Sequence, residues 1–300
     1  MKNKRPRTRG FQPAKPKEYN VTEAEELLPF LIKVVNKSRN SVKSILTRGQ
    51  VAIDGRVSTQ FNDKLQPGQK VTIRTDMVTE APPMSGITIL HEDDAIIVIE
   101  KASGLLSIAS DNEKSNTAYR QLSDYVKSQH SDNKIFVVHR LDRDTSGVMV
   151  FARSEAIKQK MQQEWTTTKE RAYVALVEGS VSKPEGTITS WLKETSTHKM
   201  FSSKYENDGQ KAITHYKVVQ GNNNFTLMEL SLDTGRKNQI RVHMHDLGHP
   251  IAGDRKYGAG DRSIKRLCLH ARKLNFSHPV TGLPLRFVTD IPNLFKSKSR

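Results

Sequence analysis

Short apolar runs and apolar–polar alternation recur along the second half of the chain. Both patterns are typical of β-strands, because successive side chains of a strand point to opposite faces. The first such run is "AIIVIEK" at 95–101. Later ones are "IFVVHRL", "GVMVFA", "AYVALV", "TITSW", "AITHYKVV", "FTLMELSL", "NQIRVHM", "LCLHA" and "LRFVTDI". Many strands with few helices predict an α+β fold built on a mixed, largely antiparallel sheet.

Helical periodicity occurs in two places within this strand-rich part. A short helix is predicted around Ala118–Val126. Another begins after Ser154, whose hydroxyl can cap it, and carries Ile157, Met161 and Trp165 at four-residue intervals. The sequence has no internal repeat and no glycine-rich phosphate-binding motif, so a nucleotide-binding domain is not indicated.

The first 75 residues show a different pattern, in which helix and strand signals alternate. "EELLPFLIKVV" predicts a short helix, and a second follows with one apolar face formed by Val42, Ile45 and Leu46. Ser38 or Ser41 can cap this second helix. "QVAIDGRV" predicts two strands joined by an Asp-Gly turn, and "LQPGQKVTIR" a Pro-Gly turn before a closing strand. These elements predict a small α/β domain.

Shifts in composition divide the chain into five parts. Residues 1–18 are basic and proline-containing with almost no apolar periodicity, which predicts a disordered arm. Residues 19–75 form the small domain, and residues 76–88, with two adjacent prolines, form a linker. Residues 89–292 form the large domain, and residues 293–300 a basic tail.

The chain is strongly basic, with 48 Lys and Arg against 32 Asp and Glu and a net charge of +16. Only +6 belongs to residues 1–18, so the excess extends over the rest of the chain. We therefore expect nucleic acid as the partner; an anionic membrane surface is the alternative, but no basic amphipathic helix stands out. No apolar run approaches the roughly 20 residues of a membrane helix. The single cysteine, Cys268, excludes an internal disulfide, and we expect a cytoplasmic protein.

The stretch "HRLDRDTSG" at 139–147 sets dense charge between two strand-like segments. In an extended segment Arg140 and Asp142 share one side, away from the residues that alternate with them. An Asp beside an Arg stays ionised at neutral pH, so Asp142 suits either an ion-pair scaffold or a nucleophile or base. The spacing alone leaves both roles open. Asp144 and Gly147 are typical turn residues.

A second polar stretch, "TGRKNQIRVHMHDLGHP", follows about a hundred residues later. Arg236 and Lys237 lie in a predicted turn, where they can meet phosphate. His243, His245 and His249 have a spacing that could supply three zinc ligands. Because no cysteine or carboxylate cluster completes such a site, structural histidines or RNA contacts are the favoured alternative.

The small domain resembles the alpha-L RNA-binding motif, the module known from ribosomal small-subunit protein four. The matching residues are Ser38–Arg39, the apolar helix positions and "GQVAIDGRV" at Gly49–Val57, with Asp54 where asparagine is usual. In that family the second helix lays its basic face on folded RNA. The resemblance implies that role for Lys37, Arg39, Lys43 and Arg48. A solvated helix face is the alternative for these charges.

The large domain resembles the RluA family of pseudouridine synthases. Four motifs agree with the family in order and spacing: "HRLDRDTSG", "RAYVALVEG", "TGRKNQIRVHMHDLGHPIAGDRKYG" and "LCLHARKLNFSHPVTG". The match runs from about Ile89 to Ile291. Two departures are "KASG" at 101–104, where a proline is expected, and Asn238, where histidine is frequent. Neither falls on a position of the implied chemistry.

The resemblance implies an enzyme that isomerises uridine in RNA to pseudouridine, without a cofactor or a metal. Asp142 would be the catalytic aspartate, and Arg140 would displace the target base and hold its place. Tyr173 would stack on the uracil and assist proton removal from carbon-5. Arg241 would pair with Asp142 and keep it ionised. Leu269 is implied as part of the apolar floor under the base.

The target RNA is not given by these motifs. Large-subunit ribosomal RNA is the expected substrate, because an RNA-binding module precedes the catalytic domain, and transfer RNA is the alternative. Two other classes of function remain open at this point: a catalytically silent RNA-binding or ribosome-assembly factor, and a histidine-ligated metallohydrolase. We expect a monomer that acts on RNA and does not bind membranes.

Overall fold

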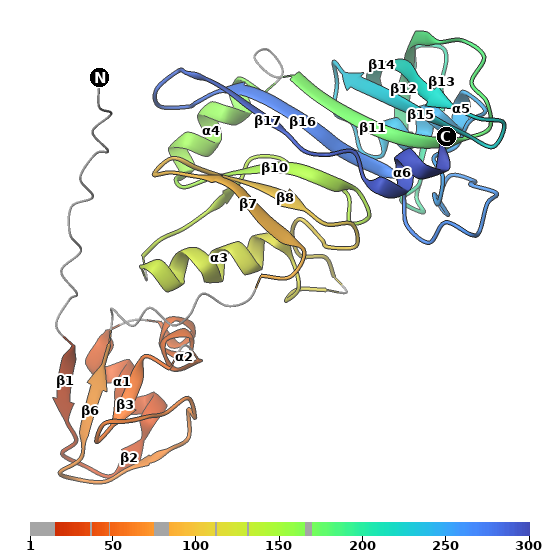
Figure 1. The fold of residues 1–300 in the computed structure, drawn as a ribbon. Helices are drawn as coiled ribbons and strands as arrows, with labels where there is room; N and C mark the ends of the chain where they lie inside the picture. The colour runs from red at the N-terminus through yellow and green to blue at the C-terminus, as the bar shows by residue number, and fades with distance from the viewer. Residues whose placement is uncertain are drawn as a thin grey trace, which may run out of the picture. The chain divides into compact units, whose positions relative to one another are not determined.

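In the computed structural model of the chain, the described residues are 16–36, 38–47, 49–74, 84–111, 113–130, 132–165 and 170–300. They fall into two compact units, which divide between Pro83 and Met84 (Figure 1). The first unit also includes Asp124–Asn133, which contains the end of the helix Ala118–Gln129 that begins in the second unit. No helix among these residues is both long and apolar enough to cross a membrane.

The first unit is a small sheet with two helices. Its elements are β1 (Lys17–Asn20), β2 (Glu25–Glu26), α1 (Leu27–Val35), α2 (Arg39–Thr47), β3 (Val51–Ile53), β4 (Arg56–Val57), β5 (Lys64–Leu65) and β6 (Lys70–Ile73). Four strands pair in the order β1-β6-β3-β4, and β2 pairs with β5. The predicted Asp-Gly hairpin is confirmed: Asp54 and Gly55 have φ of 48° and 83°, the left-handed pair that a tight two-residue hairpin requires. Ser38 Oγ accepts the Ser41 amide at 3.3 Å, so Ser38 caps α2.

The second unit is built on one large sheet. Its elements are β7 (Ile87–Glu92), β8 (Ile96–Lys101), α3 (Ala118–Gln129), β9 (Phe136–Val137), β10 (Ser146–Ala152), α4 (Glu155–Gln163), β11 (Glu170–Glu178), β12 (Glu185–Glu194), β13 (Met200–Ser203), β14 (Gln210–Gly221), β15 (Phe225–Leu232), α5 (Gln239–Asp246), β16 (Leu269–Ser277), β17 (Pro284–Val288) and α6 (Asn293–Lys298). The order is β13-β12-β14-β15-β11-β16-β10-β8-β7, with β17 beside β16 and β9 beside β10. Strands β10 and β16 pair in parallel, whereas the neighbouring pairs are antiparallel, so the predicted mixed sheet is confirmed.

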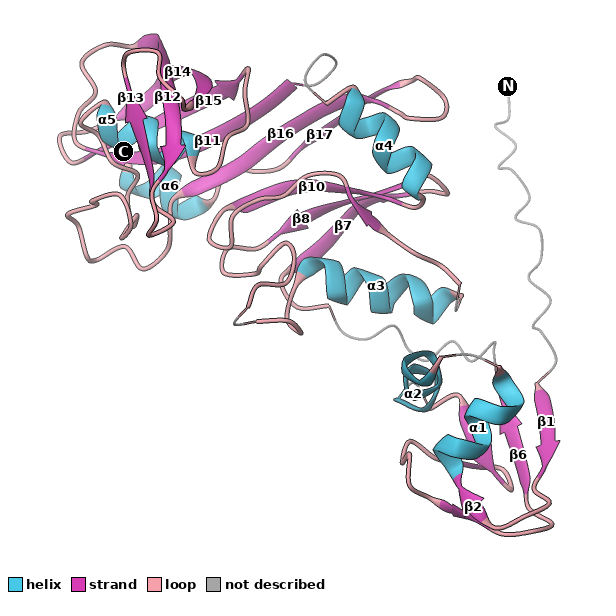
Figure 2. Ribbon diagram, turned by 180° about the vertical axis from the view of Figure 1, so that it is seen from behind, coloured by secondary structure: helices cyan, strands magenta, loops and turns pink. Residues whose placement is uncertain are grey.

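Helices pack on both halves of this sheet (Figure 2). Helix α4 contacts β9 and β10, whereas α5 contacts β13 and β14 and α6 contacts β15. The Ser154 hydroxyl accepts the Ile157 amide at 3.2 Å and caps α4, as predicted. Apolar side chains of β11, β15, α5 and the start of β16 form one core, and those of β8, β10, α4 and the later part of β16 form another.

The sequence predicted a turn at Gly147. In the structure this residue lies within β10, opposite Ala271 of β16. Its φ is +120°, and a Cβ there would lie 2.2 Å from the Ala271 carbonyl oxygen. Only glycine lets the two parallel strands approach this closely. The close approach brings the segment before β10 next to the start of β16.

Three further predictions are wrong in detail. "NQIRVHM" is helix α5 rather than a strand, because polar Gln239 and His243 are buried together with Ile240 and Met244, which gives a helical spacing.

Residues 293–300 are not a tail: α6 forms there and Phe295 is fully buried. Strand β1 begins at residue 17, inside the segment expected to be a disordered arm. Residues 1–15 of that arm, and 76–83 of the expected linker, lie outside the described residues.

Candidate active site

The segment that precedes β10 carries the acidic residue singled out in the sequence. Leu141 is buried and the His139 ring lies 4.4 Å from that of Trp165, so both face the interior. Arg140 is exposed, and Asp142 keeps about a third of its side chain, 32%, in contact with solvent. The chain then turns, with the Thr145 amide donating to the Asp142 carbonyl at 3.2 Å. Alternation at 139–142 therefore presents a half-buried carboxylate and an exposed guanidinium on one side.

Helix α5 brings Arg241 to this carboxylate. Arg241 Nη1 lies 3.6 Å from Asp142 Oδ2, an ion pair rather than a hydrogen bond. The guanidinium is largely buried, with 12% of the side chain exposed. The pairing that the family resemblance implied is therefore present in the structure. It depends on the helical conformation of α5, which the sequence pattern did not predict.

The stronger partner of Arg241 is Asp254, which sequence reasoning missed. Arg241 Nε donates to Asp254 Oδ2 at 2.7 Å and Nη2 to Oδ1 at 2.8 Å, a two-pronged pair. Asp254 is buried, and its Oδ1 also accepts the amides of Lys256 and Tyr257. Burial by itself would lower the pKa of Arg241, but the hydrogen bonds and charge of Asp254, with the charge of Asp142, raise it. Asp254 belongs to "GDRKYG" at 253–258, the end of the third family motif, and no role was predicted for it.

Asn238 and Tyr257 complete the support around Arg241. Asn238 is buried, and its Oδ1 accepts from Arg241 Nη1 at 3.4 Å. Its Nδ2 donates to the Tyr257 hydroxyl at 3.0 Å. The Arg241 guanidinium lies 5.1 Å from the centre of the Tyr257 ring, within range of a cation–π contact. Asn238, which stands where histidine is frequent in the family, is therefore a hydrogen-bond partner of Arg241.

Tyr173 of β11 lies opposite a bulge in β16. Ala172 pairs with Lys273 and Val174 with His270, so two residues of β16, Ala271 and Arg272, lie opposite Tyr173. Such a bulge bends β16 beside Tyr173. The phenol is half-buried beside the core; burial raises the pKa of Tyr173, Arg171 opposes this, and the charge of Asp142 adds to it. Tyr173 is thus a neutral aromatic ring within electrostatic reach of Asp142.

Strand β16 begins beside the same place. Leu269 is buried in the core that Tyr173 contacts, so it is available as an apolar wall. The next residue, His270, hydrogen-bonds Ser146 Oγ and Thr289 Oγ1, each at 2.8 Å. Arg266 Nη2 also donates to Ser146 Oγ, at 2.8 Å. These contacts fix the end of the segment that carries Asp142.

A buried ammonium supports that segment from the other side. Lys101, at the end of β8, is fully buried. Its Nζ donates to the carbonyl oxygens of Ala102, Leu105 and Arg143 at 2.9, 2.7 and 2.9 Å. Burial lowers the pKa of Lys101 to about 8, against the opposing charges of Asp144 and Asp142. A lysine directly after an apolar strand was the only sequence signal for this role.

The other sequence candidates of this unit lie on its surface or in its core. Arg236 and Lys237 are exposed; Arg236 Nε donates to the Lys211 carbonyl at 3.1 Å, and Lys237 pairs with Glu194. His243 is buried between Ser190 Oγ and Thr214 Oγ1, each at 2.8 Å.

The three histidines of the spacing motif therefore have separate partners. His249 Nδ1 bonds the Glu178 carbonyl at 2.9 Å, and His245 lies 3.5 Å from Asp246. In the part of the chain that the structure describes, no three His, Cys, Asp or Glu side chains are arranged to hold a metal ion.

In the first unit, Arg39 and Lys43 are exposed on α2. Lys43 Nζ lies 5.6 Å from the centre of the exposed Phe61 ring. Lys37 and Arg48, which were expected to join them, lie outside the described residues. Asp54 Oδ1 accepts the Lys70 amide at 2.8 Å, so the carboxylate fastens the hairpin to the start of β6.

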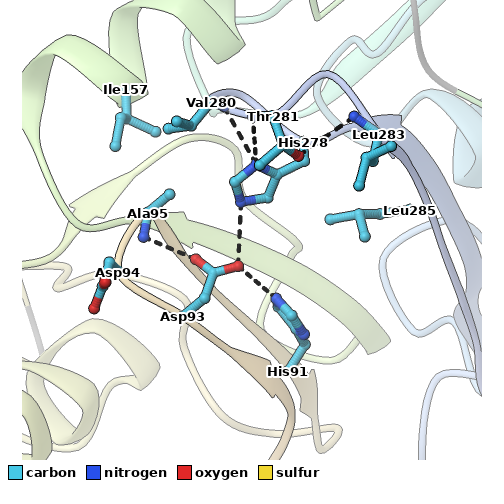
Figure 3. Close-up of a pocket in the computed structure, with 10 residues that line it drawn as sticks. All are labelled: His91, Asp93, Asp94, Ala95, Ile157, His278, Val280, Thr281, Leu283 and Leu285. Atoms are coloured by element: carbon cyan, nitrogen blue, oxygen red, sulfur yellow. Dashed lines mark hydrogen bonds and ion pairs between the residues drawn. The ribbon is translucent and has the colours of Figure 1, made fainter. Parts of the chain in front are cut away.

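A separate pocket of about 380 Å³ lies at the β7–β8 turn, lined also by α4 and the β16–β17 hairpin (Figure 3). Asp93 Oδ2 hydrogen-bonds His91 at 2.7 Å and His278 at 3.1 Å, and Oδ1 accepts the amides of Ala95 and Ile96. Both carboxylate oxygens are therefore engaged in holding the turn to the hairpin. None of the predicted site residues lines this pocket.

Comparison with known proteins decides which family this arrangement belongs to. The family model described as RNA pseudouridylate synthase matches residues 95–246. The uncharacterized RNA pseudouridine synthase YlyB of Bacillus subtilis is 32% identical to the chain, covering 90% of this chain and 91% of its own. The chain belongs to the RNA pseudouridine synthase family. The match to the RluA type, expected from the four motifs, is confirmed.

Two more relatives extend this result. Ribosomal large subunit pseudouridine synthase D of Xylella fastidiosa is 33% identical to this pseudouridine synthase, covering 85% of this chain and 82% of its own. The solved structure of human RNA Pseudouridylate Synthase Domain Containing 4 has a TM-score of 0.57 and 26% identity, over 70% of this chain and 90% of that one. The synthase is therefore an isomerase that modifies RNA, on the fold that its strand pattern predicted.

Proposed function

We propose that this synthase converts uridine to pseudouridine in large-subunit ribosomal RNA, with Asp142 as the catalytic residue. The observation that carries the proposal is the ion pair of Asp142 with Arg241, which the buried Asp254 holds in place. The pair places a largely buried cation beside the half-buried carboxylate that serves as nucleophile or base in this proposal. Relatives named as large-subunit synthases favour ribosomal RNA as the target; transfer RNA is the alternative.

The reaction needs a uridine that has left the RNA stack, because its ring is otherwise out of reach. The exposed Arg140 fills the space that the base vacates, Tyr173 stacks on the uracil, and Leu269 lines the floor below it. Aromatic stacking and an inserted guanidinium offset the cost of unstacking, a few kcal/mol by general estimates.

In the net reaction the bond from uracil N1 to ribose C1′ breaks and a bond from C5 to C1′ forms. N1 gains a proton, and the C5 proton leaves to solvent. Asp142 makes the chemical contact with the nucleotide, at C1′, at uracil C6 or at the ribose 2′ proton. Tyr173, within electrostatic reach of Asp142, assists removal of the C5 proton. No cofactor or metal is needed for these steps.

The first unit serves as an RNA-binding module in this proposal. Its exposed Arg39 and Lys43 share α2, and helix-borne cations contact RNA phosphates. Such contacts release counterions, so RNA affinity of the full chain should fall steeply with rising salt. Double substitution Arg39→Gln/Lys43→Gln should flatten that salt dependence and leave kcat unchanged.

The direct test of the active site is release of tritium from ribosomal RNA labelled at uracil C5. Asp142→Asn should abolish release, while Asp144→Asn, at a half-exposed position paired with Arg143, should keep most of it. RNA binding and the circular dichroism spectrum of Asp142→Asn should match those of the wild type. Wild-type turnover in Asp142→Asn would show that another residue performs the chemistry.

The RNA target is tested in cells. Pseudouridine mapping of total RNA, with and without this protein, should show lost positions in large-subunit ribosomal RNA. Loss confined to transfer RNA would contradict the proposed target and leave the proposed chemistry intact.

A further inference from the structure

Three cationic groups surround the ring of Tyr257, next to the Asp142–Arg241 pair. The ring is buried, and its hydroxyl accepts hydrogen bonds from the Met200 amide at 3.1 Å and from Asn238 Nδ2 at 3.0 Å. The cations are Lys199, Arg241 and Lys256, whose charged groups lie 5.5, 5.1 and 5.8 Å from the ring centre. Cationic side chains from the β12–β13 turn, from α5 and from the loop after Asp254 thus lie around one buried aromatic ring.

Two of these cations are not neutralised by a neighbouring carboxylate. Among the residues that the structure describes, neither Lys199 nor Lys256 forms an ion pair. Lys256 Nζ donates one hydrogen bond, to the His198 carbonyl at 2.8 Å. An ammonium group carries three donors, so Lys256 retains capacity to bind an anion. Both side chains belong to exposed residues.

A third lysine of this surface, Lys237, is paired with Glu194 at the end of β12. The same carboxylate oxygen lies 3.0 Å from His198 Nδ1. Hydrogen bonds from Lys237 and His198 lower the pKa of Glu194. Because the side chains of Lys237 and Glu194 are 47% and 38% exposed, their pairing contributes little net free energy and can be exchanged for another partner.

Electrostatics connect this surface to the site at Asp142. Burial lowers the pKa of Lys256, repulsion by Arg241 and Lys237 lowers it further, and Asp142 and Glu194 oppose the shift. Lys256 is therefore close enough to respond to the charges of both Asp142 and Glu194. Crowded positive groups of this kind favour an incoming anion.

We propose that Lys199, Lys237 and Lys256 bind the backbone phosphates that flank the target uridine, and that Glu194 occupies the phosphate position at Lys237 until RNA arrives. The inference rests on the proposed function, because it requires the uridine to lie at Asp142. A uridine that enters the site brings the phosphates on either side with it. Carboxylate and phosphate both accept hydrogen bonds from an ammonium, so RNA can replace Glu194 without loss of bonding at Lys237.

The test measures binding of the full chain to a transcript of large-subunit ribosomal RNA at several salt concentrations. An Asp142→Asn background prevents turnover during the measurement. Lys256→Gln and Lys237→Gln should each weaken binding about fivefold and lower the slope of log affinity against log salt by roughly one. Lys158→Gln, at a lysine of α4 paired with Glu155, is the matched control and should leave the slope unchanged.

Glu194→Gln gives the sharper result, because it should act in the opposite direction. Removal of the competing carboxylate should tighten RNA binding about threefold. That gain should disappear in the Lys237→Gln background, since Glu194 acts through Lys237. In otherwise wild-type protein, the lysine substitutions should raise KM for tritium release and change kcat less than about twofold.

Two outcomes would overturn the inference: wild-type affinity and salt slope in both Lys256→Gln and Lys237→Gln, or weaker binding in Glu194→Gln. Failure of the proposed function looks different. In that case the wild-type protein releases no tritium from labelled RNA, whatever the lysine variants do to binding. Normal turnover with unchanged binding in the lysine variants would contradict the phosphate surface alone.

Discussion

Arg241 binds Asp254 through two parallel hydrogen bonds of 2.7 and 2.8 Å, inside the protein. Only the third nitrogen of the guanidinium faces the Asp142 carboxylate, at 3.6 Å. Asp254 thus fixes the direction of Arg241 and shares its charge. The guanidinium is thereby held opposite Asp142 in a fixed direction, which preorganises the site.

Asp254→Asn should therefore lower kcat. The substitution keeps the shape but removes the buried charge that orients Arg241, and the guanidinium becomes free to bind Asp142 directly. We expect a fall in kcat of about 10- to 100-fold for tritium release, with KM for RNA little changed. Asp208→Asn, on an exposed residue paired with Lys193, is the control. Unchanged kcat in Asp254→Asn would contradict this role of Asp254.

Tyr173→Phe removes the hydroxyl and keeps the ring, so it tests the two roles of Tyr173 separately. Since the pKa of Tyr173 is raised, the phenol stays protonated across the neutral range and up to at least its ordinary pKa. The ring of phenylalanine preserves stacking, so RNA affinity should stay within about threefold, while kcat should fall about 100-fold through loss of proton transfer. Tyr173→Leu should weaken binding as well. Equal kcat in Tyr173→Phe and wild type would leave stacking as the only role of Tyr173.

Lys101→Met should destabilise the second unit and loosen the segment that carries Asp142. Methionine has a similar length but cannot donate to the carbonyl oxygens of Ala102, Leu105 and Arg143, of which that of Arg143 still accepts the Gly104 amide. We expect a loss of about 3 kcal/mol in the free energy of unfolding, measured in urea, together with lower kcat in the folded protein. The control is Lys273→Met, whose ammonium pairs with Glu170 near the surface. A loss in Lys101→Met no larger than in the control would contradict this account.

Acid should destabilise the protein through His243. Burial lowers the pKa of His243 to about 4, against an ordinary value of 6.5. Between these values the unfolded chain binds a proton that the folded chain does not, so the free energy of unfolding falls as the pH falls from 6.5 toward 4. The shift corresponds to about 3 kcal/mol at 1.36 kcal/mol per pH unit. Urea unfolding at several pH values should show this slope, and His243→Gln should flatten it.

His245→Asn is the control for that measurement, because His245 is half-exposed on the same helix. Its substitution should leave the slope between pH 6.5 and 4 unchanged. The same slope in His243→Gln and wild type would assign the acid sensitivity to other groups, among them the buried His270.

Local sequence signals determined much of the architecture. The Asp54-Gly55 pair specified a tight hairpin because only left-handed backbone angles close it, and Ser154 specified the start of α4 because its hydroxyl satisfies a free amide. Period-two alternation specified most strands of the mixed sheet. Asp142, Tyr173 and Arg241 were predicted as site residues from the sequence, through motifs whose order and spacing match a family.

Tertiary structure alone decided how these residues meet. The segment around Arg241 alternates like a strand, yet it forms α5, because Gln239 and His243 find buried partners on β12 and β14. The Arg241–Asp254 pair, the β16 bulge opposite Tyr173 and the burial of Lys101 have no local signature, since each depends on contacts between distant segments. Local patterns record which face of an element is apolar. They do not record which polar group on another element will satisfy a buried charge, and in this protein that pairing builds the site.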